Sequence, residues 1–148
     1  MLSVAEEELL LGAAKDHLRT MTIIALDTGM RRGEITSQQW EDIDFSRKLL
    51  FVTHSKTPEG ESREIPLTQR LSELLLRNRA DKGLLIGYQG QPVRIVKRSW
   101  KTALKNAGIR HLRFHDLRHR ADSPIMPNYS RGISRCAVWR RVPSFAAG

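Results

Sequence analysis

The strongest folding signal in this 148-residue sequence is an apolar helical segment that stops at a glycine. From about His17 to Thr28, apolar residues recur at helical spacing and predict a helix with one buried face. These residues are Leu18, Met21, Ile24 and Ala25. Gly29 follows, and glycine adopts the left-handed conformation at a helix end without strain. We therefore expect the next helix to begin almost at once, from about Arg31 to Gln39.

This short junction is expected to place Arg31 in the first turn of the second helix. Backbone N–H groups at a helix start attract anions, and an arginine there adds a permanent positive charge. Arg31 is therefore a candidate anion-binding residue, whereas its neighbour Arg32 is expected to be solvated. For Glu34 two interpretations remain open: it holds a site residue in place, or it faces the solvent.

A second motif, RFHDLRH, occupies residues 113–119. His115 and Arg118 are three positions apart, which places them on one face of a helix. The planar guanidinium of arginine can bind two phosphate oxygens, and histidine can transfer a proton near neutral pH. The pair therefore suits a phosphodiester, and Arg31 would complete a clamp around it. Taken alone, the H-x-x-R spacing is at least as typical of solvated residues on a basic helix.

The charge of the chain favours a polyanionic partner, because the formal net charge is +9. The excess is concentrated between Arg94 and Arg120, where nine Lys and Arg residues stand against one acid, Asp116. Within this segment three lysines recur every four residues and form a stripe suited to DNA phosphates, although such stripes are often merely solvated. They are Lys97, Lys101 and Lys105.

Three blocks of the sequence, in order, resemble the signature motifs of the tyrosine recombinases, the phage integrase family. TGMRRGEI at residues 28–35, followed by WEDID at 40–44, resembles the first block of the family. SKT at 55–57 and SREIPL at 62–67 resemble its β-hairpin with an active-site lysine, and RFHDLRH resembles its second block. The resemblance runs from about Leu2 to His119.

The resemblance implies an α+β, mainly helical catalytic domain with a small three-stranded antiparallel sheet. Further helices are expected from a capping box at Ser3–Glu6, after Thr68, and from about Val93 to Ala107. A turn is expected at Thr57–Gly60 by its composition. The three strands are predicted at Leu49–Thr53, Arg63–Leu67 and Leu84–Tyr88.

The resemblance also implies phosphoryl transfer on double-stranded DNA without a metal or other cofactor. In the family a tyrosine attacks a DNA phosphate, which gives a 3′-phosphotyrosyl link and a free 5′-hydroxyl, and a second 5′-hydroxyl reverses the step. Arg31 and Arg118 would then hold the non-bridging oxygens, Lys56 would act as general acid, and His115 would act as acid/base or hydrogen-bond donor. Further protomers would assemble on the DNA through an intact carboxy-terminal segment.

The sequence changes character after His119. Neither Lys nor Glu occurs again, and three prolines interrupt any helix. We therefore expect a partial catalytic domain at residues 1–119 and an atypical tail at 120–148, either disordered or frame-shifted. The only tyrosine in that tail, Tyr129, lies too close to Arg118 for the spacing of the family, so the nucleophile stays unassigned.

Three functions remain open from the sequence. The first is a truncated or decayed tyrosine recombinase without its nucleophile, and the second is a DNA-binding remnant that does not cleave. The third, a metal-site protein, is raised by His111, His115 and His119, which recur every four residues in a pattern similar to H-E-x-x-H. The single cysteine, Cys136, allows no internal disulfide, and the sequence shows neither a signal peptide nor a membrane span, so a cytoplasmic location is expected.

Overall fold

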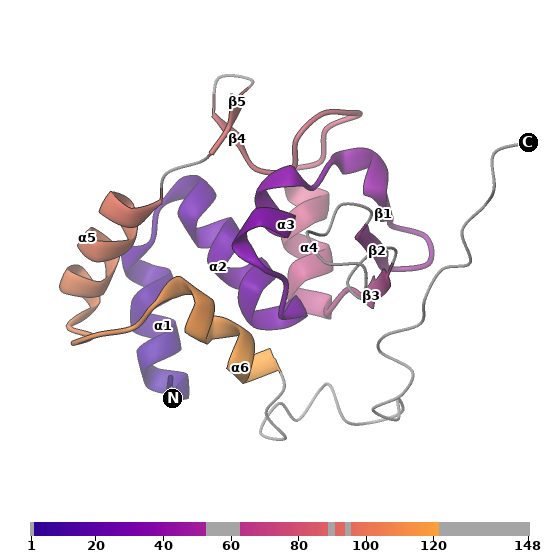
Figure 1. Ribbon diagram of the computed structural model, residues 1–148. Coiled ribbons are helices and arrows are strands. Elements are labelled where there is room, and N and C mark those ends of the chain that lie inside the picture. Colours follow the sequence, from indigo (N-terminus) through magenta and orange to yellow (C-terminus); the bar gives the residue numbers. More distant parts are fainter. Residues whose placement is uncertain (1, 53–62, 89–90, 94–95, 122–148) are drawn as a thin grey trace, which may run out of the picture.

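The computed structural model describes residues 2–52, 63–88, 91–93 and 96–121. Figure 1 shows helices gathered around α2 (Asp16–Thr28), with a small sheet on one side. Every residue from Met21 to Met30 is buried, which makes α2 and the chain that follows it the centre of the core. α2 contacts α1 (Val4–Ala13), α3 (Arg32–Ser37), α4 (Gln69–Arg77), η3 (Phe114–Leu117) and α6 (Arg118–Ala121).

Local signals set the ends of these helices as the sequence predicts. α1 begins with the expected capping box, in which Ser3 N–H donates to Glu6 Oε2 (2.8 Å) and Glu6 N–H donates to Ser3 Oγ (3.2 Å). α2 ends at Gly29, whose φ of 67° is left-handed. Gly108 ends α5 (Lys97–Ala107) with a φ of 70°. Capping and glycine signals therefore fix the helical frame locally.

Two helices begin later than predicted. α3 begins at Arg32 because Arg31 is its extended N-cap, with a ψ of 149°. α3 also ends at Ser37, where the chain becomes extended at Gln38, whose carbonyl accepts the N–H of Leu85 (2.8 Å). α5 begins at Lys97 and not at Val93, because residues 91 and 92 form a strand.

The structure confirms the mainly helical fold with a three-stranded antiparallel sheet. Its strand order is β1 (Ile43–Asp44), β2 (Leu49–Val52) and β3 (Arg63–Pro66). β2 and β3 are predicted strands, and they pair with Leu49 opposite Pro66 and Val52 opposite Arg63. The predicted turn at Thr57–Gly60 lies outside the described residues.

The prediction that Leu84–Tyr88 forms the third strand is wrong. Leu84 makes an isolated bridge with Gln39, so this segment pairs with the loop after α3 and not with the sheet. Further along, β4 (Gly87–Tyr88) pairs with β5 (Gln91–Pro92) in a separate hairpin, shown in Figure 1. The third strand is β1, whose two residues are too few for an alternating pattern.

A turn stabilised by one aspartate connects β1 to β2. Asp44 Oδ1 accepts hydrogen bonds from Ser46 Oγ (2.6 Å) and from the N–H of Arg47 (3.0 Å).

No helix within the described part of the chain has the length and apolarity needed to cross a membrane.

Candidate functional site

The two sequence motifs meet at one cavity of about 1210 Å³. Arg31, His115 and Arg118 all line it, although 84 positions or more of sequence separate the first from the others. Its floor contains apolar side chains such as Trp100 and Phe114. Glu34 is the one acidic residue among the described lining residues. The basic side chains of the lining are Arg31, Arg32, Lys97, Arg98, Lys101, Arg113 and Arg118.

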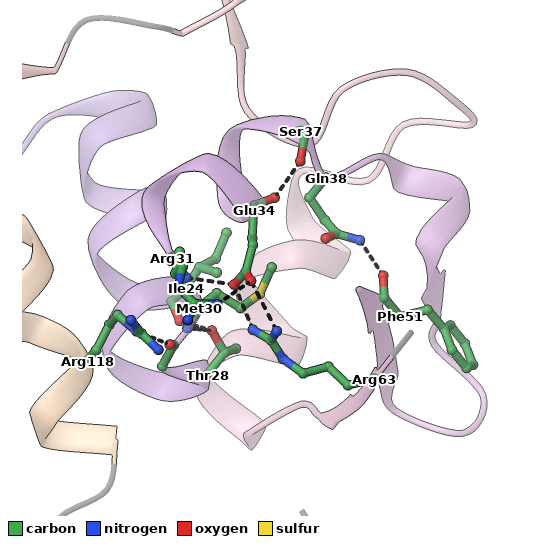
Figure 2. A network of polar contacts seen from close by, with 11 residues as sticks. Ile24, Thr28, Met30, Arg31, Glu34, Ser37, Gln38, Phe51, Arg63 and Arg118 are labelled. Carbon is green, nitrogen blue, oxygen red and sulfur yellow. Dashed lines mark hydrogen bonds and ion pairs between the residues drawn. The ribbon is translucent and has the colours of Figure 1, made fainter. Parts of the chain in front are cut away.

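Arg118 reaches the first motif directly. Its Nε donates to the carbonyl oxygen of Gly29 over 2.8 Å, a contact between residues 89 positions apart. Figure 2 shows the Arg118 side chain pointing toward the short junction between α2 and α3. The left-handed conformation of Gly29 turns the chain at this junction, so the same glycine that ends α2 also provides the acceptor for Arg118.

Arg31 presents its guanidinium to the cavity, but its backbone N–H is already engaged. The N–H donates to Glu34 Oε2 (2.8 Å), and Nη1 lies 3.3 Å from Glu34 Oε1. Arg31 is thus the N-cap of α3 and not, as the sequence predicted, a residue of its first turn. Its side chain is 44% exposed, so the guanidinium itself is accessible to a ligand.

Glu34 is buried, which resolves its two sequence interpretations in favour of the one that holds a site residue in place. Its residue exposure is 3%, and its carboxylate binds Arg31 through both the backbone and the side chain of that residue. A solvent-facing glutamate on α3 is therefore excluded.

The second arginine that binds Glu34 is Arg63, which is not among the site residues predicted from the sequence. Arg63 begins β3, and its Nη1 and Nη2 donate to the two carboxylate oxygens of Glu34 over 3.1 and 2.6 Å. The signal was present in the strand alternation, because Arg63 lies on the same inward face as Ile65, which is fully buried. An arginine at such a position requires a carboxylate partner.

His115 and Arg118 do not lie on one continuous α-helix. His115 belongs to the 3₁₀ segment η3, and Arg118 is the first residue of α6. Because a 3₁₀ helix repeats every three residues, the two side chains still reach the same cavity. The ring of His115 packs edge-on against that of His119, with centroids 6.2 Å apart. Asp116 Oδ2 accepts the N–H of Arg113 (3.0 Å) and so fixes the start of η3.

Trp100 attaches α5 to the loop that precedes η3. Its Nε1 donates to the carbonyl oxygen of Leu112 (2.7 Å), and its ring meets the edge of Phe114 at a centroid distance of 5.3 Å. Of the predicted lysine stripe, Lys97 and Lys101 line the cavity. Lys105, which is also exposed on α5, is not among the lining residues.

Of the remaining site residues predicted from the sequence, two lie outside the described residues and the others lie within them. Lys56 and Tyr129 lie outside the described residues. His111 lines the cavity with His115, but no group of three or more His, Cys, Asp or Glu side chains in the described ranges is placed to hold a metal ion. The metal-site alternative therefore gains no support from the histidine spacing.

Comparison with known proteins gives consistent matches to DNA recombinases. The chain is 35% identical over 116 residues to the shufflon-specific DNA recombinase of Escherichia coli, which covers 78% of this chain and 29% of that protein. It is 27% identical over 129 residues to the integrase of Salmonella phage P22, covering 77% of this chain and 33% of that protein. The chain thus spans about a third of the length of these curated relatives.

A solved structure supports the same assignment. A lambda integrase dimer bound to a COC' core site matches with a TM-score of 0.67 and 25% identity, over 90% of this chain and 54% of that one. The model of the phage integrase family matches residues 1–128. This chain therefore belongs to the phage integrase family of tyrosine recombinases.

Proposed function

We propose that this chain binds double-stranded DNA and holds one backbone phosphate in the cavity between α3, α5 and η3. The observation that carries the proposal is the Arg118–Gly29 hydrogen bond, because it brings the second arginine to the junction that carries Arg31. Both guanidinium groups then face a cavity rich in positive charge. Bidentate arginine contacts are well suited to phosphate oxygens.

In the proposed complex, Arg31 and Arg118 contact the non-bridging oxygens and His115 donates a hydrogen bond or moves a proton. Fixed positive charge of this kind stabilises the negative charge that develops in phosphoryl transfer. Lys56 is the proposed general acid by its place in the family motif. The similarity to a shufflon-specific DNA recombinase and to a phage integrase supports DNA recombination as the reaction of the family site.

We further propose that the chain as written is a decayed copy that binds DNA without cleaving it. Tyr129 follows Pro124 and Pro127 in a segment whose sequence has no helical pattern. Without a nucleophile aligned with the leaving oxygen, the charges of the cavity have no attacking atom to act on.

The salt dependence of duplex DNA binding tests the phosphate site. We expect log Kobs to fall linearly with log salt, and each lost phosphate contact to reduce the slope by about 0.9. Arg31→Gln and Arg118→Gln should each reduce the slope by about this amount. Arg77→Gln is the matched control, because Arg77 is exposed on α4 and does not line the cavity.

Two results would contradict the proposal. One is DNA affinity that does not change with salt. The other is a folded Arg118→Gln variant, with the circular dichroism spectrum of the parent chain, whose slope equals that of Arg77→Gln.

A further inference from the structure

We propose that Arg63 is a positioning residue that neutralises Glu34 and thereby keeps the positive charge of Arg31 available to an anion in the cavity. The inference rests on the proposed phosphate contact of Arg31, and it assigns a specific electrostatic task to a residue on a different element. Arg63 itself is 8% exposed and is not among the described residues that line the cavity.

One carboxylate is shared by two arginines from different parts of the fold, as Figure 2 shows. Arg63 binds both oxygens of Glu34, over 3.1 and 2.6 Å, in the bidentate geometry that makes arginine–carboxylate pairs strong. The guanidinium of Arg31 makes a longer contact of 3.3 Å to one oxygen. Of these two arginines, Arg63 is therefore the stronger counter-charge of Glu34 and Arg31 the weaker one.

The two arginines also differ in how far their side chains are exposed to solvent. The side chain of Arg63 is 9% exposed, whereas that of Arg31 is 44% exposed and lines the cavity. Of the two guanidinium groups that bind Glu34, that of Arg31 is therefore the more accessible one, and it faces the cavity.

Removal of Arg63 changes this balance. A buried carboxylate must be paired, and its attraction to a nearby cation is strong where the effective dielectric constant is low. Of the two arginines that bind Glu34, only Arg31 would then remain. The guanidinium of Arg31 would be drawn toward Glu34 and would bind a phosphate less well.

Arg63 also attaches β3 to α3, so loss of binding alone would not identify its role. The charge role makes a distinct prediction, because the additional change Glu34→Gln removes the negative charge that captures Arg31. A glutamine oxygen can still accept the N–H of Arg31, whereas the Arg63–Glu34 ion pair between β3 and α3 is not rebuilt. Rescue by Glu34→Gln is therefore expected for the charge role and not for simple attachment.

The experiment measures duplex DNA affinity and its salt slope for the full chain and four variants. Arg63→Met should weaken binding about tenfold and lower the slope by about 0.9, as Arg31→Gln does, because one charge-assisted phosphate contact is lost. The double variant Arg63→Met/Glu34→Gln should recover the parental slope and bind within about threefold of the parent. Arg63→Lys, which keeps the charge, should bind more tightly than Arg63→Met.

The double variant decides the outcome even if Arg63→Met does not fold, because it removes both the buried guanidinium and the buried negative charge. If the double variant folds but keeps the low slope of Arg31→Gln, only the role of Arg63 is overturned, and the proposed phosphate contact of Arg31 stands. An unchanged slope in Arg31→Gln instead removes the proposed phosphate contact, and the inference falls with it. A parental slope in the double variant, together with a reduced slope in Arg31→Gln, supports both.

Discussion

Two arginines of this domain, Arg63 and Arg70, bind buried carboxylates. Arg70 on α4 donates through Nη1 to Glu7 Oε1 (2.7 Å) and binds both oxygens of Asp27. Both acids are buried, with exposures of 7% and 3%. Burial lowers the pKa of Arg70, but its bonds to Asp27 and Glu7 outweigh that effect and raise the pKa above its ordinary value. Arg70 therefore stays charged and joins α1, α2 and α4.

Replacing Arg70 with methionine should destabilise the domain. The substitution removes the guanidinium that Asp27 and Glu7 share, and we expect the free energy of unfolding to fall by about 1–3 kcal/mol, less than for a fully buried pair because Arg70 is partly solvated. Urea unfolding measures the change. Arg77→Met, on the same helix and exposed, should stay within about 0.5 kcal/mol of the parent. Equal losses in the two variants would show that the cluster contributes no specific stability.

The arginines also show what the sequence reveals and what it conceals. Arg31 and Arg118 could be selected as partners because each belongs to a motif with a chemical purpose. Arg63 lies in the hairpin block and Arg70 in no block, and neither position indicates its partner: Glu34 and Asp27 are 29 and 43 positions away. Only the folded chain shows which carboxylate each of them reaches.

Among the secondary-structure elements, α5 packs against α1 and is joined to the loop before η3 by the side chain of Trp100. Trp100→Phe keeps an aromatic ring but removes the hydrogen bond from Nε1 to the carbonyl oxygen of Leu112. We expect a loss of about 1–2 kcal/mol in the free energy of unfolding, because that carbonyl loses its partner. Chemical denaturation measures this, with Thr102→Ala on the exposed face of α5 as the control. A loss no larger than in that control would show that the bond does not hold the loop.

The capping box of α1 gives a prediction about pH. The pKa of Glu6 is lowered by the hydrogen bond from the N–H of Ser3 and then by that from the Ser3 side chain. A carboxyl whose pKa is lowered on folding stabilises the helix while it is ionised, and this stabilisation is lost as the pH falls through the lowered pKa. Ser3→Ala should therefore raise the pKa of Glu6 toward its ordinary value, as measured by NMR titration. An unchanged pKa would show that the box does not persist in solution.

Helices were easier to predict than sheet partners for a physical reason. The ends of α1, α2 and α5 depend on residues within one turn of the end, such as Ser3, Gly29 and Gly108. The sheet depends on pairings between separate segments of the chain. β1 has only two residues, too few to show an alternating pattern, so Leu84–Tyr88 was predicted as the third strand instead. The later start of α3 has a local cause instead, because the carboxylate of Glu34, three residues further on, accepts the N–H of the N-cap Arg31.

For this 148-residue chain we predict binding to DNA without covalent attachment. A nicked suicide substrate, which traps any phosphotyrosyl intermediate, should give no adduct on a denaturing gel. This follows from the proposed lack of a positioned nucleophile, since Tyr129 lies in a sequence with no helical pattern. An adduct that disappears in the Tyr129→Phe variant would show that the chain is an active recombinase.

The most direct test of the phosphate site observes its two arginines while DNA binds. The Nε–Hε NMR signals of Arg31 and Arg118, assigned with Arg31→Lys and Arg118→Lys variants, should both shift as duplex DNA is added, with the same apparent Kd. Raising the salt concentration should reverse both shifts together, because in the proposed site both groups hold a single phosphate. DNA binding that leaves both signals unchanged would contradict the account.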